Sequence, residues 1–217
     1  MVFHLAALAR IQPSFKNPHE VFKVNALGTE NVLEYARRDN IPLIYAGSSS
    51  THGDHYANPY TFTKWQGELL CEMYNKVYNL PTVITRFYNV YGDHQLLDGA
   101  YAAVIGIFLR LYGEGKPLTI TGDGEQRRDF THVDDIVDGL IKSYENIDIS
   151  SGKTFEFGRG ENYSINEIAS FFKTKTEYIP KRPGEMDITL CESVEARELI
   201  GFNPKKDIKD YLNETLF

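Results

Sequence analysis

Ser48, Tyr60 and Lys64 have the types and spacing of a site that abstracts a proton. Tyr60 and Lys64 are four positions apart, so on a helix their side chains share one face. An ammonium group near a phenol favours the phenolate and lowers the pKa of the tyrosine. Ser48 follows an apolar run, where its hydroxyl can orient or relay a proton. Together the three predict a general base that removes a proton from a substrate hydroxyl.

The tyrosine–lysine spacing is a weak signal by itself. A second Tyr-x-x-x-Lys occurs at 112–116, but Gly113 and Gly115 interrupt a helix there, so we interpret it as a loop. The first pair has a more favourable context, because it follows serines that close a strand and sits in a helix starting near Pro59. On the local sequence alone, an ordinary amphipathic pair on a helix surface remains the alternative.

The elements that must position these residues alternate between strand and helix. We predict strands at 2–6, 43–46 and 82–87, and helices at 18–39 and 59–78. This alternation indicates βαβ units and a parallel sheet. After Gly92 we predict helices at 101–112, 133–144, 164–172 and 194–200, and short strands at 118–121, 154–157 and 177–179. In the first helix, Val21, Val24, Leu27, Gly28 and Val32 form the predicted buried face.

Seven segments, in this order, carry a resemblance to a known family. They are VFHLAA (2–7), NALGTENV (25–32), Ser48 five residues before Gly53, PYTFTK (59–64), RFYNVYG (86–92), GDGEQRRDFTHVDD (122–135) and RPGE (182–185). With them the chain resembles the extended short-chain dehydrogenase/reductase family, specifically its nucleotide-sugar epimerases and dehydratases. The resemblance covers nearly the whole chain.

The resemblance implies an α/β fold in two parts. Residues 1–93 would form an N-terminally truncated Rossmann-like parallel sheet that binds NAD. Residues 94–217 would form mainly a small α+β substrate-binding lobe, and some of its elements would return to the sheet.

The resemblance also implies a role for each matching residue. Tyr60 would be the base, Lys64 would hold the nicotinamide ribose, and Ser48 would hydrogen-bond the hydroxyl that is oxidised. The residues implied to line NAD are Leu5, Ala6, Ala7, Asn25, Tyr60, Lys64 and Tyr88. Those implied to bind the nucleotide-sugar are Asn89, at its diphosphate, and Thr119, Ile120, Thr121, Arg128 and Arg182, at its nucleotide.

The two arginines are chemically suited to this role, because a guanidinium binds phosphate oxygens bidentately. For Arg128, a salt bridge with Asp129 or Asp134 is the alternative. For Arg182, which lies in an apparent loop, a solvated charge is the alternative. No metal site is expected.

The reaction implied is epimerisation at the sugar C4. Family dehydratases carry an Asp-Glu pair directly after the catalytic residue, whereas Ser49 and Ser50 follow Ser48 here. No carboxylate is therefore available there to take a proton from carbon. Thr189 stands where a bulky residue restricts the pocket to plain hexoses in the resembled epimerases. Its small side chain hints at a UDP-N-acetylhexosamine as an alternative to a UDP-hexose.

Two departures from the family pattern concern the cofactor and the cover of the site. The glycine-rich turn that cradles a pyrophosphate is not found in the sequence, and roughly sixty residues, two βαβ units, would be expected before Val2. We therefore expect strand 2–6 at a sheet edge, weakened NAD binding and doubtful activity of this chain. The segment from Ser48 to Tyr60 is also shorter than is usual in family epimerases.

Composition excludes several other classes of protein. The net charge of −7 argues against a nucleic-acid surface and against an anionic membrane surface. Two cysteines, Cys71 and Cys191, rule out a disulfide framework and favour a reducing, cytoplasmic location. No apolar run approaches 18 residues, so no transmembrane helix is predicted.

Three functions therefore remain. The chain is an NAD-dependent nucleotide-sugar epimerase, a non-catalytic relative that binds a nucleotide-sugar or a partner, or a structural or interaction protein that uses the surface of the former enzyme. The helix faces that pack on the expected first strands in the family would be exposed and apolar here, so self-association or a partner should cover them. We expect a homodimer through the helices at 18–39 and 59–78.

Overall fold

The computed structural model describes residues 1–216, and it divides them into two compact units. Unit 1 comprises Met1–Phe87, Val137–Phe157 and Ser193–Asn203. Unit 2 comprises Tyr88–Ile136, Gly158–Glu192 and Pro204–Phe217, described here to residue 216.

Unit 1 is built on a parallel sheet of four strands in the order β1-β2-β3-β8. The strands are β1 (Val2–His4), β2 (Leu43–Ala46), β3 (Thr82–Phe87) and β8 (Thr154–Phe157). All three neighbouring pairs are parallel, as the alternation of strand and helix predicts. The expected edge position of the first strand is confirmed, because β1 pairs only with β2 among the described strands. β2 is buried along its whole length, which explains its continuous apolar sequence.

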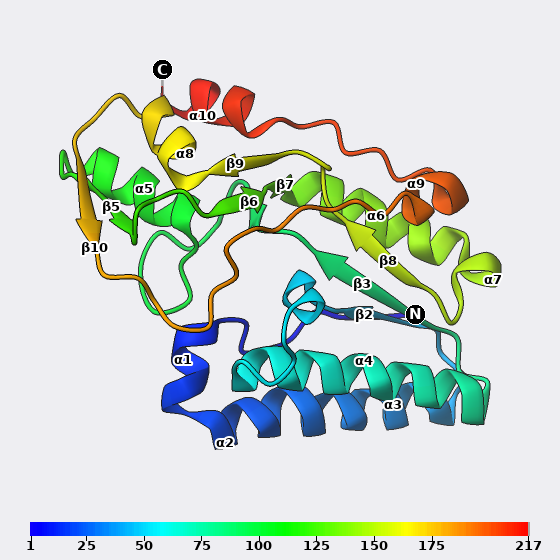
Figure 1. Cartoon of the computed structure of the whole chain (residues 1–217). Helices are drawn as coiled ribbons and strands as arrows, with labels where there is room; N and C mark the ends of the chain where they lie inside the picture. The colour runs from blue at the N-terminus through cyan, green and yellow to red at the C-terminus, as the bar shows by residue number, and fades with distance from the viewer. Residues whose placement is uncertain (217) are drawn as a thin grey trace. The chain divides into compact units, whose positions relative to one another are not determined.

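Helices cover both faces of this sheet (Figure 1). α3 (Gly28–Arg38) and α4 (Pro59–Tyr78) run side by side on one face. The other face carries α6 (Val133–Glu145), whose Gly139 approaches the ring of Phe157, and α9 (Glu195–Ile200). The short helices α1 (Ile11–Lys16) and α7 (Ile147–Ser150) complete the unit.

The predicted helix at 18–39 contains a π-helical turn. α2 (Pro18–Val21) leads into the π-helix η1 (Phe22–Leu27), which continues as α3. The Gly28 backbone N–H bonds the carbonyl of Lys23, five residues back. The extra residue in this turn shifts the helix face, so the predicted face through Leu27 is wrong and Leu27 is 55% exposed. The buried face instead contains Val21, Asn25, Thr29, Leu33 and Ala36.

α4 begins and ends at the predicted residues. The Asn58 side chain caps its first turn by accepting from the Thr61 N–H at 2.8 Å, and Asn79 ends it in the left-handed conformation (φ 54°). Its buried side contains several polar residues, and it includes Gly67, where a Cβ would lie 2.1 Å from the Tyr45 hydroxyl. Several apolar residues of α4 therefore remain exposed, namely Leu69, Met73 and Val77.

Unit 2 combines short two-stranded sheets with three helices, which is the expected α+β character. The strand pairs are β5 (Leu118–Thr121) with β10 (Thr176–Ile179), β4 (Val90–Tyr91) with β7 (Thr131–His132), and β6 (Arg127–Asp129) with β9 (Asn162–Ser164). Only the last pair is antiparallel. The helices are α5 (Val104–Gly113), α8 (Ile165–Phe171) and α10 (Ile208–Leu216). α8 begins with a capping box, in which Ser164 and Glu167 bond each other's backbone N–H groups.

Candidate active site

The hydroxyls of Tyr60 and Ser48 meet at the carboxyl end of β2. Ser48 follows β2 through Gly47, and Tyr60 lies in the first turn of α4. The Tyr60 hydroxyl donates to Ser48 Oγ at 3.1 Å, and Ser48 Oγ also lies 2.9 Å from Ser50 Oγ. Ser48 is in addition the N-cap of the short 3-10 helix η2 (Ser49–His52). This arrangement joins a phenol and a serine in one hydrogen-bond chain, as the sequence predicts.

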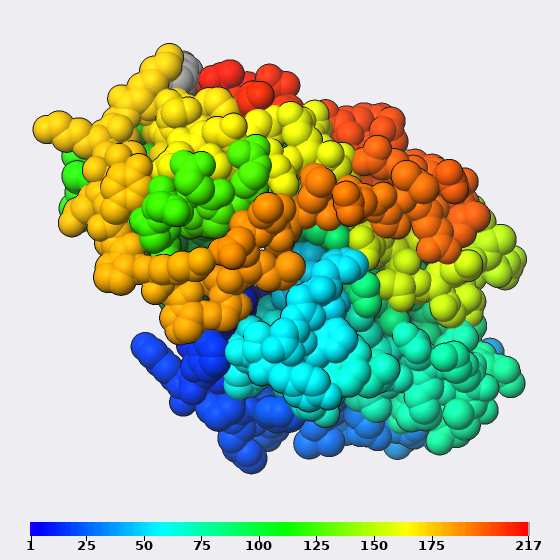
Figure 2. All heavy atoms as spheres, viewed as in Figure 1, coloured from blue at the N-terminus to red at the C-terminus, as the bar shows by residue number. Residues whose placement is uncertain are grey.

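The segment between Ser48 and Tyr60 stands out on the surface of unit 1. In the space-filling view, residues 49–58 (cyan) form a raised ridge beside α4 (Figure 2). His55 stacks on the Trp65 ring of α4 with 4.5 Å between ring centroids. The ridge therefore rests on an aromatic contact despite its short length.

Lys64 is buried beneath the sheet end and is directed toward the backbone. Its Nζ donates to the carbonyl of Ala46 at 2.5 Å and lies 4.3 Å from the centre of the Tyr45 ring. Burial lowers the pKa of Lys64 to about 8, whereas the negative charge of Glu68 acts in the opposite direction. Lys64 is thus mainly protonated at pH 7, but it loses its charge at a lower pH than an ordinary lysine.

The predicted lowering of the Tyr60 pKa is not what the structure shows. Desolvation raises the pKa of Tyr60 above its ordinary value, whereas the hydrogen bond with Ser48 and the charge of Arg10 act to lower it. The hydrogen bond of Lys64 goes to Ala46, not to the phenol. Tyr60 is therefore a neutral phenol near neutral pH.

The titration of Lys64 provides a first test of this geometry. In a ¹³Cε-lysine NMR titration, we expect one lysine with a midpoint near pH 8, assigned by its loss in Lys64→Met. Because the unfolded chain keeps this proton up to the ordinary lysine pKa of about 10.4, the unfolded state binds more protons above pH 8. The contribution of Lys64 to the free energy of unfolding should therefore rise with pH in this window. A Lys64 midpoint at 10 or above would contradict the placement.

Four of the other residues implied to bind NAD, namely Leu5, Ala6, Ala7 and Asn25, lie at the segment that follows β1. Leu5 and Ala6 are exposed directly after this strand. Asn25 is buried, and its side chain is fully engaged, since it accepts from the Leu8 N–H at 2.8 Å and donates to Leu8 O and Thr63 Oγ1. Asn25 therefore holds the segment after β1 against α4. Tyr88 is buried and belongs to unit 2.

All the residues implied to bind the nucleotide-sugar lie in unit 2. Asn89 has a positive φ of 28°, and its side-chain amide donates to Asp129 O at 2.8 Å and to Thr189 Oγ1 at 3.0 Å. Thr119 and Thr121 are partly exposed on β5, whereas Ile120 between them is buried in the core. The structure thus brings Asn89 and Thr189 together.

The two arginines differ in how strongly they are held. Arg128 is partly buried and donates to the backbone carbonyls of Arg127 and Asp187 at 2.9 and 3.2 Å. Burial lowers the pKa of Arg128. Arg182 is 46% exposed and lies 4.0 Å from Glu185.

Asp129 is a structurally important residue of unit 2 that sequence reasoning missed. It is fully buried, and its carboxylate accepts from the backbone N–H groups of Arg159, Gly160 and Cys191 at 2.9, 2.9 and 3.1 Å. Its own N–H and carbonyl reach Thr189 and Asn89. The carboxylate therefore joins three backbone segments around these residues. The only signal was its place in the RDF motif.

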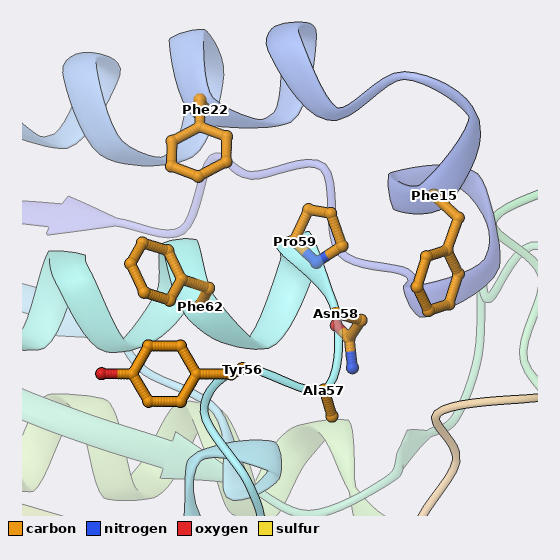
Figure 3. Close-up of a pocket in the computed structure, with 7 residues that line it drawn as sticks. All are labelled: Phe15, Phe22, Tyr56, Ala57, Asn58, Pro59 and Phe62. Carbon is orange, nitrogen blue, oxygen red and sulfur yellow. The ribbon is translucent and has the colours of Figure 1, made fainter.

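An apolar pocket of about 340 Å3 lies elsewhere on unit 1. Figure 3 shows Phe15, Phe22 and Phe62 turned toward it, with Tyr56 and the Ala57–Asn58–Pro59 segment at its rim. Ser48, Tyr60 and Lys64 are not among its lining residues. No group of three or more His, Cys, Asp or Glu residues suited to a metal ion occurs within residues 1–216.

The comparison with protein-family models and curated proteins agrees with the motifs. Residues 1–158 match the model of the NAD dependent epimerase/dehydratase family. The uncharacterized UDP-glucose epimerase YtcB of Bacillus subtilis is 31% identical over 237 residues, and the match covers 100% of this chain and 73% of that protein.

Solved structures show the same likeness. The UDP-glucose 4-epimerase of Thermotoga maritima, with UDP-glucose, superposes with a TM-score of 0.93 at 27% identity, covering 99% of this chain and 75% of that one. The UDP-glucuronic acid 4-epimerase of Bacillus cereus, in complex with UDP-glucuronic acid and NAD, gives a TM-score of 0.89 at 29% identity, covering 97% and 72%. Because the family model matches well over half of the chain and the motifs occur in order, the chain belongs to the NAD-dependent epimerase/dehydratase family.

Proposed function

We propose that the chemistry of this chain is that of an NAD-dependent nucleotide-sugar 4-epimerase, acting on a UDP-hexose or UDP-N-acetylhexosamine. The observation that carries the proposal is the 3.1 Å hydrogen bond between Tyr60 and Ser48 at the carboxyl end of a parallel strand. Ligands of open parallel sheets bind outside this end of the strands. Relatives whose structures contain a UDP-sugar and NAD support the substrate and the cofactor.

The residues of unit 1 fit the nicotinamide half of NAD. Leu5 and Ala6 are exposed after β1, and Ala6 and Ala7 add little bulk, so a flat ring can approach the backbone there. β1 pairs with β2, whose end leads to Ser48. We propose that Leu5, Ala6, Ala7, Asn25, Tyr60, Lys64 and Tyr88 hold the cofactor. Bound NAD would supply the acceptor and donor of hydride.

In its phenolate form, Tyr60 would take the proton of the sugar hydroxyl. Ser48, whose Oγ now accepts a hydrogen bond from Tyr60, would orient that sugar hydroxyl. Lys64, held against Ala46, would place positive charge beneath the site. Unit 2 would bind the nucleotide-sugar through Asn89, Thr119, Ile120, Thr121, Arg128 and Arg182. The small side chain at Thr189 would leave space for an N-acetyl group.

Calorimetric titration with NAD, UDP, UDP-glucose and UDP-N-acetylglucosamine tests this proposal. Micromolar binding of NAD together with a UDP-sugar, followed by interconversion of the C4 epimers, is the expected result for the enzyme. Binding of the UDP-sugar without NAD would instead support a non-catalytic nucleotide-sugar-binding protein. Binding of no ligand would contradict both functions, and a strict preference for UDP-glucose would remove the N-acetyl part of the proposal.

We further propose that the chain is a homodimer through the outer surface of η1, α3 and α4. Three exposed apolar residues of α4, Leu69, Met73 and Val77, recur every four residues. Leu27 of η1 and Tyr35 of α3 are also exposed. Phe22 and Phe62 of the pocket belong to the same helices (Figure 3). Such a patch on a soluble protein needs a cover.

Light scattering after size exclusion should therefore give about twice the chain mass of 24.8 kDa. Met73→Lys should shift this mass to that of one chain, because a buried unpaired ammonium destabilises an interface. Tyr178→Lys in unit 2, at a residue that is also exposed (56%), is the matched control. A monodisperse monomer in the wild type would contradict the dimer.

The location of the protein is the remaining part of the proposal. Cys71 and Cys191 are both free and buried, which supports a reducing compartment such as the cytoplasm. Within residues 1–216, no helix has the length and apolar character required to cross a membrane.

A further inference from the structure

The turn that carries Ser48 is held by side chains from three other elements of unit 1. The turn itself has local hydrogen bonds: Thr51 N–H and Oγ1 donate to Ser48 O at 3.1 and 2.7 Å, and the Gly53 N–H donates to Ser50 O at 3.2 Å. These bonds shape the turn, but they do not fix its place relative to Tyr60. Its place depends on contacts with the rest of the unit.

The first contact is a buried ion pair behind the turn. Arg86, near the end of β3, binds Glu68 of α4 with both sides of its guanidinium, Nη2–Oε2 at 2.7 Å and Nε–Oε1 at 3.2 Å. Glu68 is 3% exposed. Its Oε1 also accepts long hydrogen bonds, both 3.4 Å, from the Ser48 N–H and the Thr51 hydroxyl. The pair therefore contacts the beginning of the turn.

Gly47 allows the backbone to lie directly on this ion pair. A Cβ at Gly47 would be 2.7 Å from Glu68 Oε1 and 3.2 Å from Arg86 Cγ. Any larger residue would push the Ser48 backbone away from the carboxylate. The glycine before Ser48 is thus explained by the ion pair and not by a turn conformation.

The second contact lies at the far end of the turn. Glu156 of β8, which stands opposite Arg86 in the sheet register, lies 3.4 Å from Arg86 Nη1. The same carboxylate is 2.6 Å from Nε2 of His52, the last residue of η2. Arg86 therefore joins two carboxylates, of which one holds the start of the turn and the other its end.

We infer that Arg86 is a positioning residue for Ser48, because with Glu68 and Glu156 it holds both ends of the 48–52 turn at the distance that Tyr60 needs. The inference rests on the proposed function only in naming Ser48 as catalytic. A buried ion pair is weak evidence of net stability, since its desolvation cost offsets its attraction. A positioning role explains why this one also contacts the turn.

The test separates positioning from folding by removing both charges together. Glu68→Leu/Arg86→Met replaces the pair by apolar groups of similar volume, a change that buried pairs tolerate. Arg86→Lys keeps the charge without the planar fork. Arg37→Gln is the matched control, because Arg37 forms a similar two-bond pair with Glu34 on the exposed side of α3 (2.9 and 2.8 Å).

Two measurements on the ligand-free chain decide the question. In amide hydrogen exchange, we expect Ser50, Thr51 and Gly53 to exchange about tenfold faster in the double variant, as loss of one charge-assisted hydrogen bond implies. The amides of β2 and β3 should keep their protection. In a ¹³Cζ-tyrosine NMR titration, the Tyr60 midpoint should move to higher pH, because the hydrogen bond between Tyr60 and Ser48, which lowers the Tyr60 pKa, is lost. Arg86→Lys should show a smaller effect, and Arg37→Gln none.

The inference would be overturned if, in the double variant, the turn amides exchanged at the wild-type rate and the Tyr60 titration midpoint did not move. Faster exchange spread evenly over β2 and β3 would also overturn it, because the pair would then support the sheet and not the turn. Neither readout needs NAD or turnover. Failure of the proposed function, seen as absent ligand binding, is therefore distinguishable from failure of this inference.

Discussion

Tyr60→Phe should lower the rate of sugar oxidation by about 10²- to 10⁴-fold, the range that a positioned general base contributes. The ring remains, so the packing of α4 against the turn is kept, and only the hydroxyl that bonds Ser48 is lost. The measurement is interconversion of the C4 epimers with saturating NAD. Binding of the UDP-sugar, followed by calorimetry, should not change.

The raised pKa of Tyr60 predicts how turnover should change with pH. Because burial raises the pKa of Tyr60, the neutral phenol predominates at pH 7, and the share of phenolate rises with pH. Turnover of the wild type should therefore rise between pH 6 and 9, and this rise should be absent in Tyr60→Phe. Tyr56→Phe, at a tyrosine that is 75% exposed, is the control and should match the wild type. An unchanged rate in Tyr60→Phe would assign the base elsewhere.

Asp129→Asn should lower the free energy of unfolding by about 3 kcal/mol. The carboxylate accepts three backbone hydrogen bonds in a fully buried place, and hydrogen bonds to a charged group contribute roughly 1.5–3 kcal/mol each. The asparagine amide would turn an N–H group toward one of these donors. Urea unfolding followed by circular dichroism measures the change.

Asp187→Asn is the matched control for Asp129. Its carboxylate is 76% exposed and pairs with Lys181 at 2.7 Å, a kind of pair that contributes about 0–1 kcal/mol. Each variant replaces the carboxylate of one aspartate in unit 2 by a carboxamide. Equal losses in the two would show that the buried carboxylate has no special role.

The regular elements of unit 1 were predictable because their sequence patterns are local. The run at 43–46 and the β-branched run at 82–87 end at the residues where the strands end, and Pro59 marks the start of α4. α1 was missed, since its six residues include a proline and show no periodicity. The two-residue strands β4 and β7 carry no pattern that a sequence could reveal.

The grouping of Ser48 with Tyr60 was expected from the motifs, but the residues that support Ser48 were not. The partners of Arg86 are 18 and 70 residues away, and the partners of Asp129 are 30 to 62 residues away. Such pairs depend on which strands become neighbours. Glu68 does stand four residues after Lys64, a spacing that placed it on the same face of α4. The direction of the Tyr60 pKa also could not be read from spacing, because burial outweighs the neighbouring charges.

The π-helical turn of η1 has a consequence for insertions and deletions in this chain. The wide turn takes up one extra residue without turning α2 relative to α3, so deleting one residue between Phe22 and Leu27 would leave a regular α-helix. The deletion would, however, remove the wide turn that contains Asn25, whose side chain now bonds Leu8 and Thr63. A change of length in this helix would therefore act on the segment after β1 as well as on the helix itself.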